Sequence, residues 1–387
     1  MSKKFYLALI ALLLLVFIFP CDVPAVQRIL QKTSRTPNGI YYYEYYYYEN
    51  ENNEDNENYN YDYDEDEDED DDDEEYFYYP EPDNTQININ KNNKFKFNHN
   101  KNIYNFEPKF SPYSPGSVKQ EELNKALNEL NYIRRLAGVP SNVRLNFKYN
   151  DLAQHGAVLL DAVNTLTHTP GRPRDMPENF YKKGYEATSH GNISYSQYSI
   201  NGQKFGNIDL CETLKGYLDD TGHNMSTLGH RRWVLNPRLK ETGFGVSNRN
   251  GYSVMYVIEE GNNGKWPINS EFISWPVKNN SHPLKYFGDD VAWSVVLNRE
   301  VFAKCRDKNI KVKLTRERDN KIWNFSYANH DGYFNVNHDG YAYDECIIFR
   351  PDNINYESGD SFRVEITGLT QKNNNNGKIN YRVRFED

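Results

Sequence analysis

The stretch TLGHRRWVLNPRLKETGFGV, residues 227–246, carries the clearest run of local structural signals in the chain. The pair Asn236-Pro237 is expected to end a short helix, because proline cannot continue one. The residues after it, in which Gly243 and Gly245 alternate with larger side chains, predict a strand. A helix followed by a strand is therefore expected here. We expect its four basic side chains to be solvated: Arg231, Arg232, Arg238 and Lys240.

His230 is the residue of this stretch that carries a functional hypothesis. It follows Gly229 at the start of the helix, where the helix dipole disfavours a positive charge and favours the neutral imidazole. The neutral ring is the form that binds a metal ion. A single histidine makes no site, so the hypothesis depends on partners elsewhere in the chain.

Three further helices are predicted before this stretch, from apolar residues that recur at three- and four-residue steps. The first begins near Ser117, where SVKQ has the form of a capping box, and ends at Gly138 and Pro140. The second and third cover residues 150–164 and 208–218. Two strands, residues 242–247 and 252–260, are then expected to pair around the turn dipeptide Asn250-Gly251.

From residue 261 onward the pattern changes to short β-type runs separated by Gly, Asn and Asp. Seven such runs predict a β-sandwich of about 110 residues. A local repeat, NHDGYFNV from residue 329 and NHDGYAYD from residue 337, is interpreted as two turns, although His330/Asp331 and His338/Asp339 would also suit a cation. Helices followed by strands favour an α+β chain with two domains, residues 117–260 and 261–387.

Residues 1–25 have the features of a secretory signal peptide. Two lysines precede 15 mostly apolar residues, and Ala25 offers a small side chain for cleavage. The apolar run is short for a spanning helix and no later stretch suits one, so no transmembrane span is expected in the mature chain. Residues 26–116 are rich in Tyr, Asp, Glu and Asn and cannot bury a core, which predicts a disordered arm.

Charge is divided unevenly along the chain. Residues 41–83 hold 21 acidic side chains and no Lys or Arg, whereas residues 84–387 hold 40 basic and 33 acidic ones. The body of the protein is therefore mildly basic behind an acidic arm. It shows no stripe of Lys and Arg interleaved with aromatic residues, and the arm would repel phosphates. Both observations argue against nucleic acid as a partner.

Three cysteines remain once Cys21 leaves with the signal peptide. An odd number allows at most one disulfide, which we expect between Cys305 and Cys346 because they lie in the same region. Cys211 lies in an apolar context and is expected to be a buried thiol. Four Asn-x-Ser triplets are candidate glycosylation sites of an exported chain: Asn192, Asn224, Asn279 and Asn324.

Familiar catalytic and nucleotide-binding motifs are absent from the sequence, among them His-Glu-x-x-His, Cys-x-x-Cys, the Walker loop and Gly-x-Ser-x-Gly. What remains is a set of histidines in the helical region. Of these, His168 lies between two threonines at a helix exit, from which a side chain can project into a cleft.

Residues 123–258 resemble the CAP superfamily, which comprises cysteine-rich secretory proteins, antigen 5 and pathogenesis-related 1 proteins. Six segments match in the family's order: LNELNYIRRLAGVP, LAQHGAVLLDAVNTLTHTP, GNIS, GYLDD, TLGHRRWVLNP and ETGFGVS. The GHRRW.LNP form and the β-rich C-terminal region look closer to bacterial-type CAP domains than to the cysteine-rich animal ones.

The resemblance implies an α-β-α sandwich with a central cleft, in which two histidines and two acidic residues converge. The histidine positions match His168 and His230, and one acidic position matches Asp220. The second acidic position matches Gly191, which has no side chain, so His190 beside it is a candidate substitute. In some family members the histidines hold a divalent cation, so zinc or another divalent ion on His168 and His230 is the cofactor expected here.

Because the set of acids is incomplete, we expect a secreted CAP-domain protein that binds rather than catalyses, and we assign no catalytic residue. The resemblance suggests a small apolar ligand, such as a sterol or fatty acid, or a partner at a cell surface. One alternative is a metal-dependent hydrolase, such as a protease or peptidase, that uses the cleft histidines. Another is an adhesive or cell-wall protein whose acidic arm is the active part.

Overall fold

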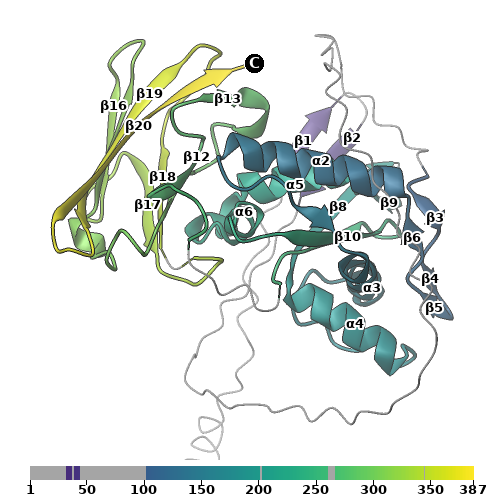
Figure 1. Cartoon of the computed structure of the whole chain (residues 1–387). Coiled ribbons are helices and arrows are strands. Elements are labelled where there is room, and N and C mark those ends of the chain that lie inside the picture. Colours follow the sequence, from purple (N-terminus) through teal and green to yellow (C-terminus); the bar gives the residue numbers. More distant parts are fainter. Residues whose placement is uncertain (1–31, 37–38, 44–101, 201–202, 260–265, 344) are drawn as a thin grey trace, which may run out of the picture. The chain divides into compact units, whose positions relative to one another are not determined.

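The computed structural model describes residues 32–36, 39–43, 102–200, 203–259, 266–343 and 345–387 (Figure 1). These residues form both helices and sheets, which confirms the predicted α+β class. The predicted signal peptide, Cys21 and most of the predicted arm lie outside the described residues. Within the described part, no helix combines the length and the apolar content needed to cross a bilayer.

A seven-stranded sheet forms the centre of the first half of the described chain. Its neighbouring strands are antiparallel except for β10 and β7, which run parallel. From one edge to the other the order is β1 (Lys32–Thr36), β2 (Gly39–Tyr43), β8 (Gly191–Ile200), β11 (Tyr252–Tyr256), β10 (Glu241–Ser247) and β7 (Arg144–Leu145), with β9 (Gln203–Gly206) also paired to β8.

Helices cover both faces of this sheet. They are α2 (Gln120–Leu136), α3 (Phe147–Val163), α4 (Glu178–Ser189), α5 (Leu210–Asp219) and α6 (Gly229–Val234), with the 3-10 turn η1 (Gly222–Ser226) between the last two. α3 packs on one face, where Leu152 and Leu160 meet Ile193 and Val254 of the sheet. α4 lies beside α3, whereas α2 and α5 lie on the other face (Figure 1). This is the α-β-α sandwich that the sequence resemblance implied.

Gly243 and Gly245 of β10 explain how closely α3 lies against the sheet. A Cβ atom at Gly243 would lie 2.1 Å from the backbone carbonyl carbon of Tyr149, and one at Gly245 would lie 2.2 Å from that of Ala153. Helix and strand are therefore in backbone contact, which only glycine permits. The TGFGV segment marks a helix–strand contact as well as a strand.

Helix α4 was not predicted from the sequence. Its buried face consists of Phe180, Gly184, Ala187 and Thr188, and three small residues among four give no apolar periodicity. Gly184 allows α4 to pack tightly on α3, because a Cβ atom there would lie 2.9 Å from the Cδ2 atom of Leu159.

Regular structure begins before Ser117. The predicted arm contains β1, β2, β3 (Tyr104–Phe106), β4 (Lys109–Phe110) and β5 (Tyr113–Ser114). Buried Tyr104 ties this region to the sheet, because its hydroxyl donates to the Val246 carbonyl and accepts from the Asn248 amide. The predicted capping box is wrong, since Ser117 belongs to β6 (Ser117–Val118) and Lys119 precedes α2 without a side-chain cap.

The C-terminal half consists of two facing sheets. One has the order β12 (Phe272–Trp275), β14 (Trp293–Leu297), β18 (Cys346–Pro351) and β17 (Gly332–Asn337), and the other has the order β13 (Ser281–Pro283), β20 (Asn376–Glu386), β19 (Ser361–Thr370), β15 (Lys311–Arg316) and β16 (Ile322–Ser326). The short 3-10 turns η2 (Leu284–Tyr286) and η3 (Asp307–Asn309) lie between strands.

Aromatic rings fill the space between these two sheets. The ring of Trp293 lies 5.6 Å from that of Phe362 and 6.0 Å from that of Phe385, centroid to centroid. All seven predicted β runs are strands. The sequence missed β13 and β17, and β17 lies in the first copy of the NHDGY repeat, where only turns were expected.

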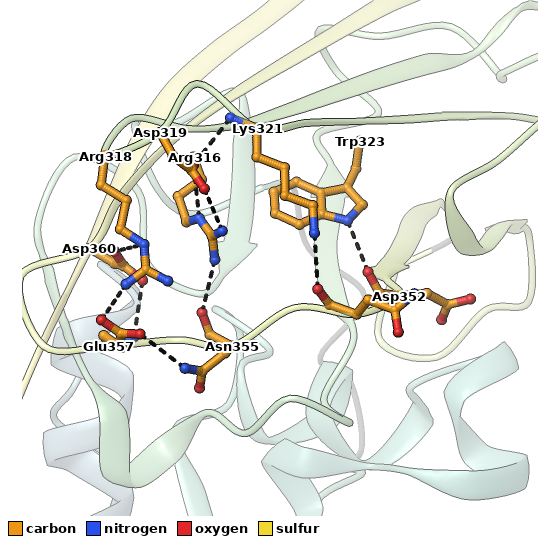
Figure 2. A network of polar contacts seen from close by, with 10 residues as sticks. Arg316, Arg318, Asp319, Lys321, Trp323, Asp352, Asn355, Glu357 and Asp360 are labelled. Carbon is orange, nitrogen blue, oxygen red and sulfur yellow. Dashed lines mark hydrogen bonds and ion pairs between the residues drawn. The ribbon is translucent and has the colours of Figure 1, made fainter.

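Figure 2 shows a polar network around the turn between β15 and β16 of the sandwich. Arg316 donates to Asp319 at 2.6 Å and to the Asn355 carbonyl at 3.3 Å, while Arg318 lies 3.3 Å from Asp360. Hydrogen bonding by Arg316 lowers the pKa of Asp319 to about 2. These contacts join the β15–β16 turn to the segment that follows β18.

The expected Cys305–Cys346 disulfide is not formed, because the described cysteines are all free thiols. The Cys305 thiol instead donates a hydrogen bond to Glu345, whose carboxylate also accepts from the Cys305 amide at 2.9 Å. Cys211 is half-buried, and burial raises its thiol pKa to about 12.

Two of the four glycosylation predictions are wrong. Asn192 and Asn224 are each only 2 % exposed, so neither side chain can carry a glycan in the folded protein. Asn279 and Asn324 are exposed, and glycosylation there stays a prediction.

Candidate functional site

His230 lies buried in α6 and is held from two sides. Its Nδ1 atom lies 2.8 Å from the Oδ1 atom of Asp220, and its ring stacks on Tyr217 with 5.3 Å between centroids. A carboxylate accepts from N–H, so Nδ1 carries the proton and Nε2 keeps its lone pair in the neutral ring. The neighbouring carboxylate thus fixes both the orientation and the tautomer of the imidazole.

Asp220 is placed for this contact by the end of α5. It is the C-terminal capping residue, with a left-handed φ of 42° that Asp adopts more readily than most residues. It is 3 % exposed, and its second oxygen accepts from the Arg231 amide at 3.3 Å. Both carboxylate oxygens therefore contact α6.

His168 is fixed by the last turn of α4. Its Nδ1 atom lies 2.7 Å from the Thr188 carbonyl, and the Thr188 hydroxyl donates back to the His168 carbonyl at 3.2 Å. Burial lowers the pKa of His168 to about 4; the Thr188 contact opposes this shift, whereas His230 adds to it. The ring is therefore neutral at physiological pH.

The structure pairs His230 with Asp220, and that His168 joins them in one site stays a prediction. The two rings are near enough for His230 to lower the pKa of His168. In both rings Nδ1 is bound to an oxygen, and neither Nε2 atom forms a hydrogen bond with any described residue. The site thus leaves the Nε2 atom of each imidazole free of protein hydrogen bonds, and in neutral His168 that atom is an electron-pair donor.

His190 does not join this group. Its Nδ1 atom contacts the Glu186 carbonyl at 2.9 Å and the Ser189 hydroxyl at 3.0 Å, and its ring stacks on Tyr256. None of its side-chain contacts reaches His168, Asp220 or His230, so it is not a substitute for the missing acid.

Gly191 cannot be replaced by an acidic residue without damage to the fold. A Cβ atom there would lie 2.6 Å from the Ala187 carbonyl oxygen and 2.7 Å from the Cγ1 atom of Val254. One of these neighbours is backbone at the end of α4 and cannot rotate away. The close approach of α4 to β8 therefore excludes any side chain at this position.

We expect Gly191→Ala to lower the free energy of unfolding by about 2–3 kcal/mol, because the added methyl group overpacks a closed contact. Urea denaturation would measure the change. Gly171→Ala is the matched control, since its Cβ atom would meet nothing within 4 Å. Equal stability of the two variants would show that α4 can move aside and that an acid could be restored.

Three supporting residues were missed from the sequence. Asn192 donates to the His230 carbonyl at 3.0 Å, and Tyr217 donates to the Asn192 carbonyl at 2.9 Å, which joins β8, α5 and α6 behind the imidazole. Thr188 supports His168. Asn192 was interpreted as a glycan acceptor, and Thr188 lies in a helix that the sequence did not reveal.

The arginines that follow His230 were expected in solvent, and this expectation is wrong for two of them. Arg231 and Arg232 are 1 % and 3 % exposed. Arg231 donates to the Ala292 carbonyl of the sandwich half at 2.6 Å, and Arg232 donates to Asn337 at 2.6 Å. Arg238 is half-buried, with its guanidinium 4.4 Å from the ring centroid of Tyr343. Lys240 is exposed, as expected.

An apolar gap of about 160 Å³ lies between α5 and the sheet. Its lining includes Leu214, Tyr217, Phe244 and Met255. This volume counts all the space between the lining atoms, and the gap has no room for a water molecule, so it cannot hold a sterol.

Residues 127–259 match the model of the cysteine-rich secretory protein family, CAP. No curated protein and no solved structure matches the chain. The matched residues include His168, Asp220 and His230.

Proposed function

Since residues 127–259 form a domain of the CAP superfamily, we propose that this protein acts outside the cell by binding a partner through His168 and His230, and not by catalysis. The observation that supports the proposal is the pair of unbonded Nε2 atoms. Each ring has its Nδ1 atom on an oxygen acceptor, at 2.7 Å for His168 and 2.8 Å for His230. Two oriented lone pairs suit a divalent cation or the N–H and O–H groups of a partner surface.

The residues present fit a divalent ion in part. Metal-bound histidines usually donate their other ring nitrogen to a carboxylate or carbonyl, which is the arrangement here. Within the described residues, however, no three His, Cys, Asp or Glu side chains gather as metal ligands. His168 and His230 would hold the ion, and water or a partner would supply the other ligands. A bound zinc ion would act as a Lewis acid and a bridge.

Three alternatives find less support. A metal-dependent hydrolase would use a metal-bound water as its nucleophile and would need a general base beside it, but the close contacts of Gly191 exclude the second acid from that position. A sterol or fatty acid finds no room in the α5 gap. We therefore favour a partner at a surface over an enclosed apolar ligand. The adhesive alternative was based on the acidic arm, and no described residue favours it.

Zinc titration of the full chain by calorimetry tests the site. We expect His168→Ala and His230→Ala each to weaken zinc binding by about 100-fold, because each removes a ligand. Asp220→Asn should weaken it by about 10-fold, because it disturbs only the orientation of a ligand. His190→Ala serves as the control and should bind as the wild type does. Unchanged zinc binding by the His168/His230 double variant would contradict the proposal.

A further inference from the structure

A loop of the sandwich half holds the helix that carries His230. This clamp loop, residues 337–343, follows β17. Arg232 of α6 donates to the Asn337 side chain and to the Asp339 carbonyl, both at 2.6 Å. The ring of Tyr341 lies against Gly229, where a Cβ atom would be 3.0 Å from it. The position of α6 therefore depends on the position of the clamp loop.

His338 anchors the clamp loop to the rest of the sandwich. Its Nε2 atom lies 2.7 Å from the Oδ1 atom of Asp307 in η3, and its Nδ1 atom lies 3.2 Å from the Oε1 atom of Glu345 before β18. Glu345 is 1 % exposed and also accepts from Arg299 at 2.6 Å. One imidazole thus joins two carboxylates on either side of the loop.

The charges around His338 balance only when its ring is protonated. The charged and titratable groups of this cluster are Asp307, Glu345, Arg299 and the thiol of Cys305, which donates to Glu345. An imidazolium has two N–H donors, one for each carboxylate. Protonated His338 and Arg299 are then two cations beside two anions, Asp307 and Glu345. A neutral imidazole has one donor, so a lone pair must then face a carboxylate oxygen.

We propose that His338 is a proton-dependent latch, which holds the clamp loop on α6 when protonated and loosens it when neutral. The hold weakens when the ring loses its proton, because one of its two N–H donors is then gone. Because α6 carries His230, the latch would also change how firmly that ring is positioned. The inference rests on these contacts and does not require the proposed binding function.

The chain contains its own control for this inference. His330 occupies the same place as His338 in the NHDGY repeat, but it is exposed and its Nδ1 atom contacts only the Gly332 carbonyl. No carboxylate contacts it in the described structure. Protonation of His330 should therefore leave α6 unaffected.

Hydrogen exchange of the full chain, followed by mass spectrometry of peptides that cover residues 229–235, measures the latch. After correction for intrinsic rates, we expect the protection of α6 to fall by about tenfold from pH 5.5 to pH 8, as for loss of one charge-assisted hydrogen bond. In His338→Gln, protection should be low and independent of pH. His330→Gln should follow the wild type.

Asp307→Asn provides a second variant should His338→Gln fail to fold. Asp307 is partly exposed, so the change is mild, and removal of one carboxylate should reduce the dependence of α6 protection on pH. Wild-type protection that stays constant from pH 5.5 to pH 8 would overturn the proposal. The same conclusion would follow if Asp307→Asn or His338→Gln kept the wild-type pH profile.

Discussion

Arg134→Met is expected to lower the free energy of unfolding by about 4 kcal/mol. Arg134 lies in α2 with none of its side chain exposed. It donates to four backbone carbonyls: Pro140 at 2.8 Å, Val234 at 2.7 Å, Asn236 at 3.0 Å and Leu239 at 3.3 Å. Burial lowers its pKa to about 9, so the guanidinium remains charged at neutral pH.

The size of this effect follows from what the arginine satisfies. The Asn236-Pro237 stop leaves the Val234 carbonyl at the end of α6 without a helical partner, whereas the Asn236 carbonyl also accepts from the Leu239 amide at 3.0 Å. Buried carbonyls without donors cost about 1–3 kcal/mol each. Methionine fills part of the volume but donates nothing. Arg134 therefore closes the turn between α6 and β10, where proline can only end the helix.

Urea denaturation of Arg134→Met beside Arg135→Met tests this prediction. Arg135 is the next residue of the same helix and is exposed, so its replacement should change the free energy of unfolding by no more than about 0.5 kcal/mol. Similar losses of unfolding free energy in the two variants would mean that replacing either arginine destabilises α2 itself. This result would contradict the role of the carbonyl contacts.

Arg231→Met is expected to lower stability by about 3–5 kcal/mol and to uncouple the two halves of the described chain. Arg231 donates to the Leu218 carbonyl at 2.5 Å and the Asp219 carbonyl at 3.2 Å, at the end of α5. On the sandwich side it donates to the Ala292 carbonyl at 2.6 Å and the Ser294 hydroxyl at 3.1 Å. One buried cation thus joins both halves, and methionine would leave its acceptors unpaired.

Calorimetry distinguishes this effect from a local one. The wild type should unfold in a single transition, because the halves share buried contacts, whereas Arg231→Met should show two transitions. Lys240→Met is the control in the same stretch, because Lys240 is exposed and its loss should leave the single transition intact. A single transition at unchanged temperature in Arg231→Met would disprove the coupling.

The helix–strand order and the C-terminal strands could be predicted from the sequence because their signals are local. The Asn236-Pro237 stop, the glycines of β10 and the alternating β runs each act within a few residues. Helix α4 escaped detection because its buried face is built from small residues. Because α4 was not predicted, the role of Thr188 in holding His168 could not be predicted either.

The site could be predicted only in outline. The family resemblance identified His168, Asp220 and His230; the structure pairs His230 with Asp220 and leaves the part of His168 in the site as a prediction. Sequence reasoning was wrong about His190 because adjacency in the chain says nothing about the direction of a side chain. It also treated the Asn192 triplet as a glycan acceptor, whereas that amide is buried behind His230.

The sequence by itself determined most of the helices and strands, because apolar periodicity and turn residues act over short distances. The site residues His168, Asp220 and His230 came from the family resemblance. Only the tertiary structure decided that Arg134, Arg231 and Arg232 are buried. Their acceptors include backbone carbonyls of segments about 60 to 110 residues away. Every residue type has such a carbonyl, so no sequence pattern distinguishes a partnered arginine from a solvated one.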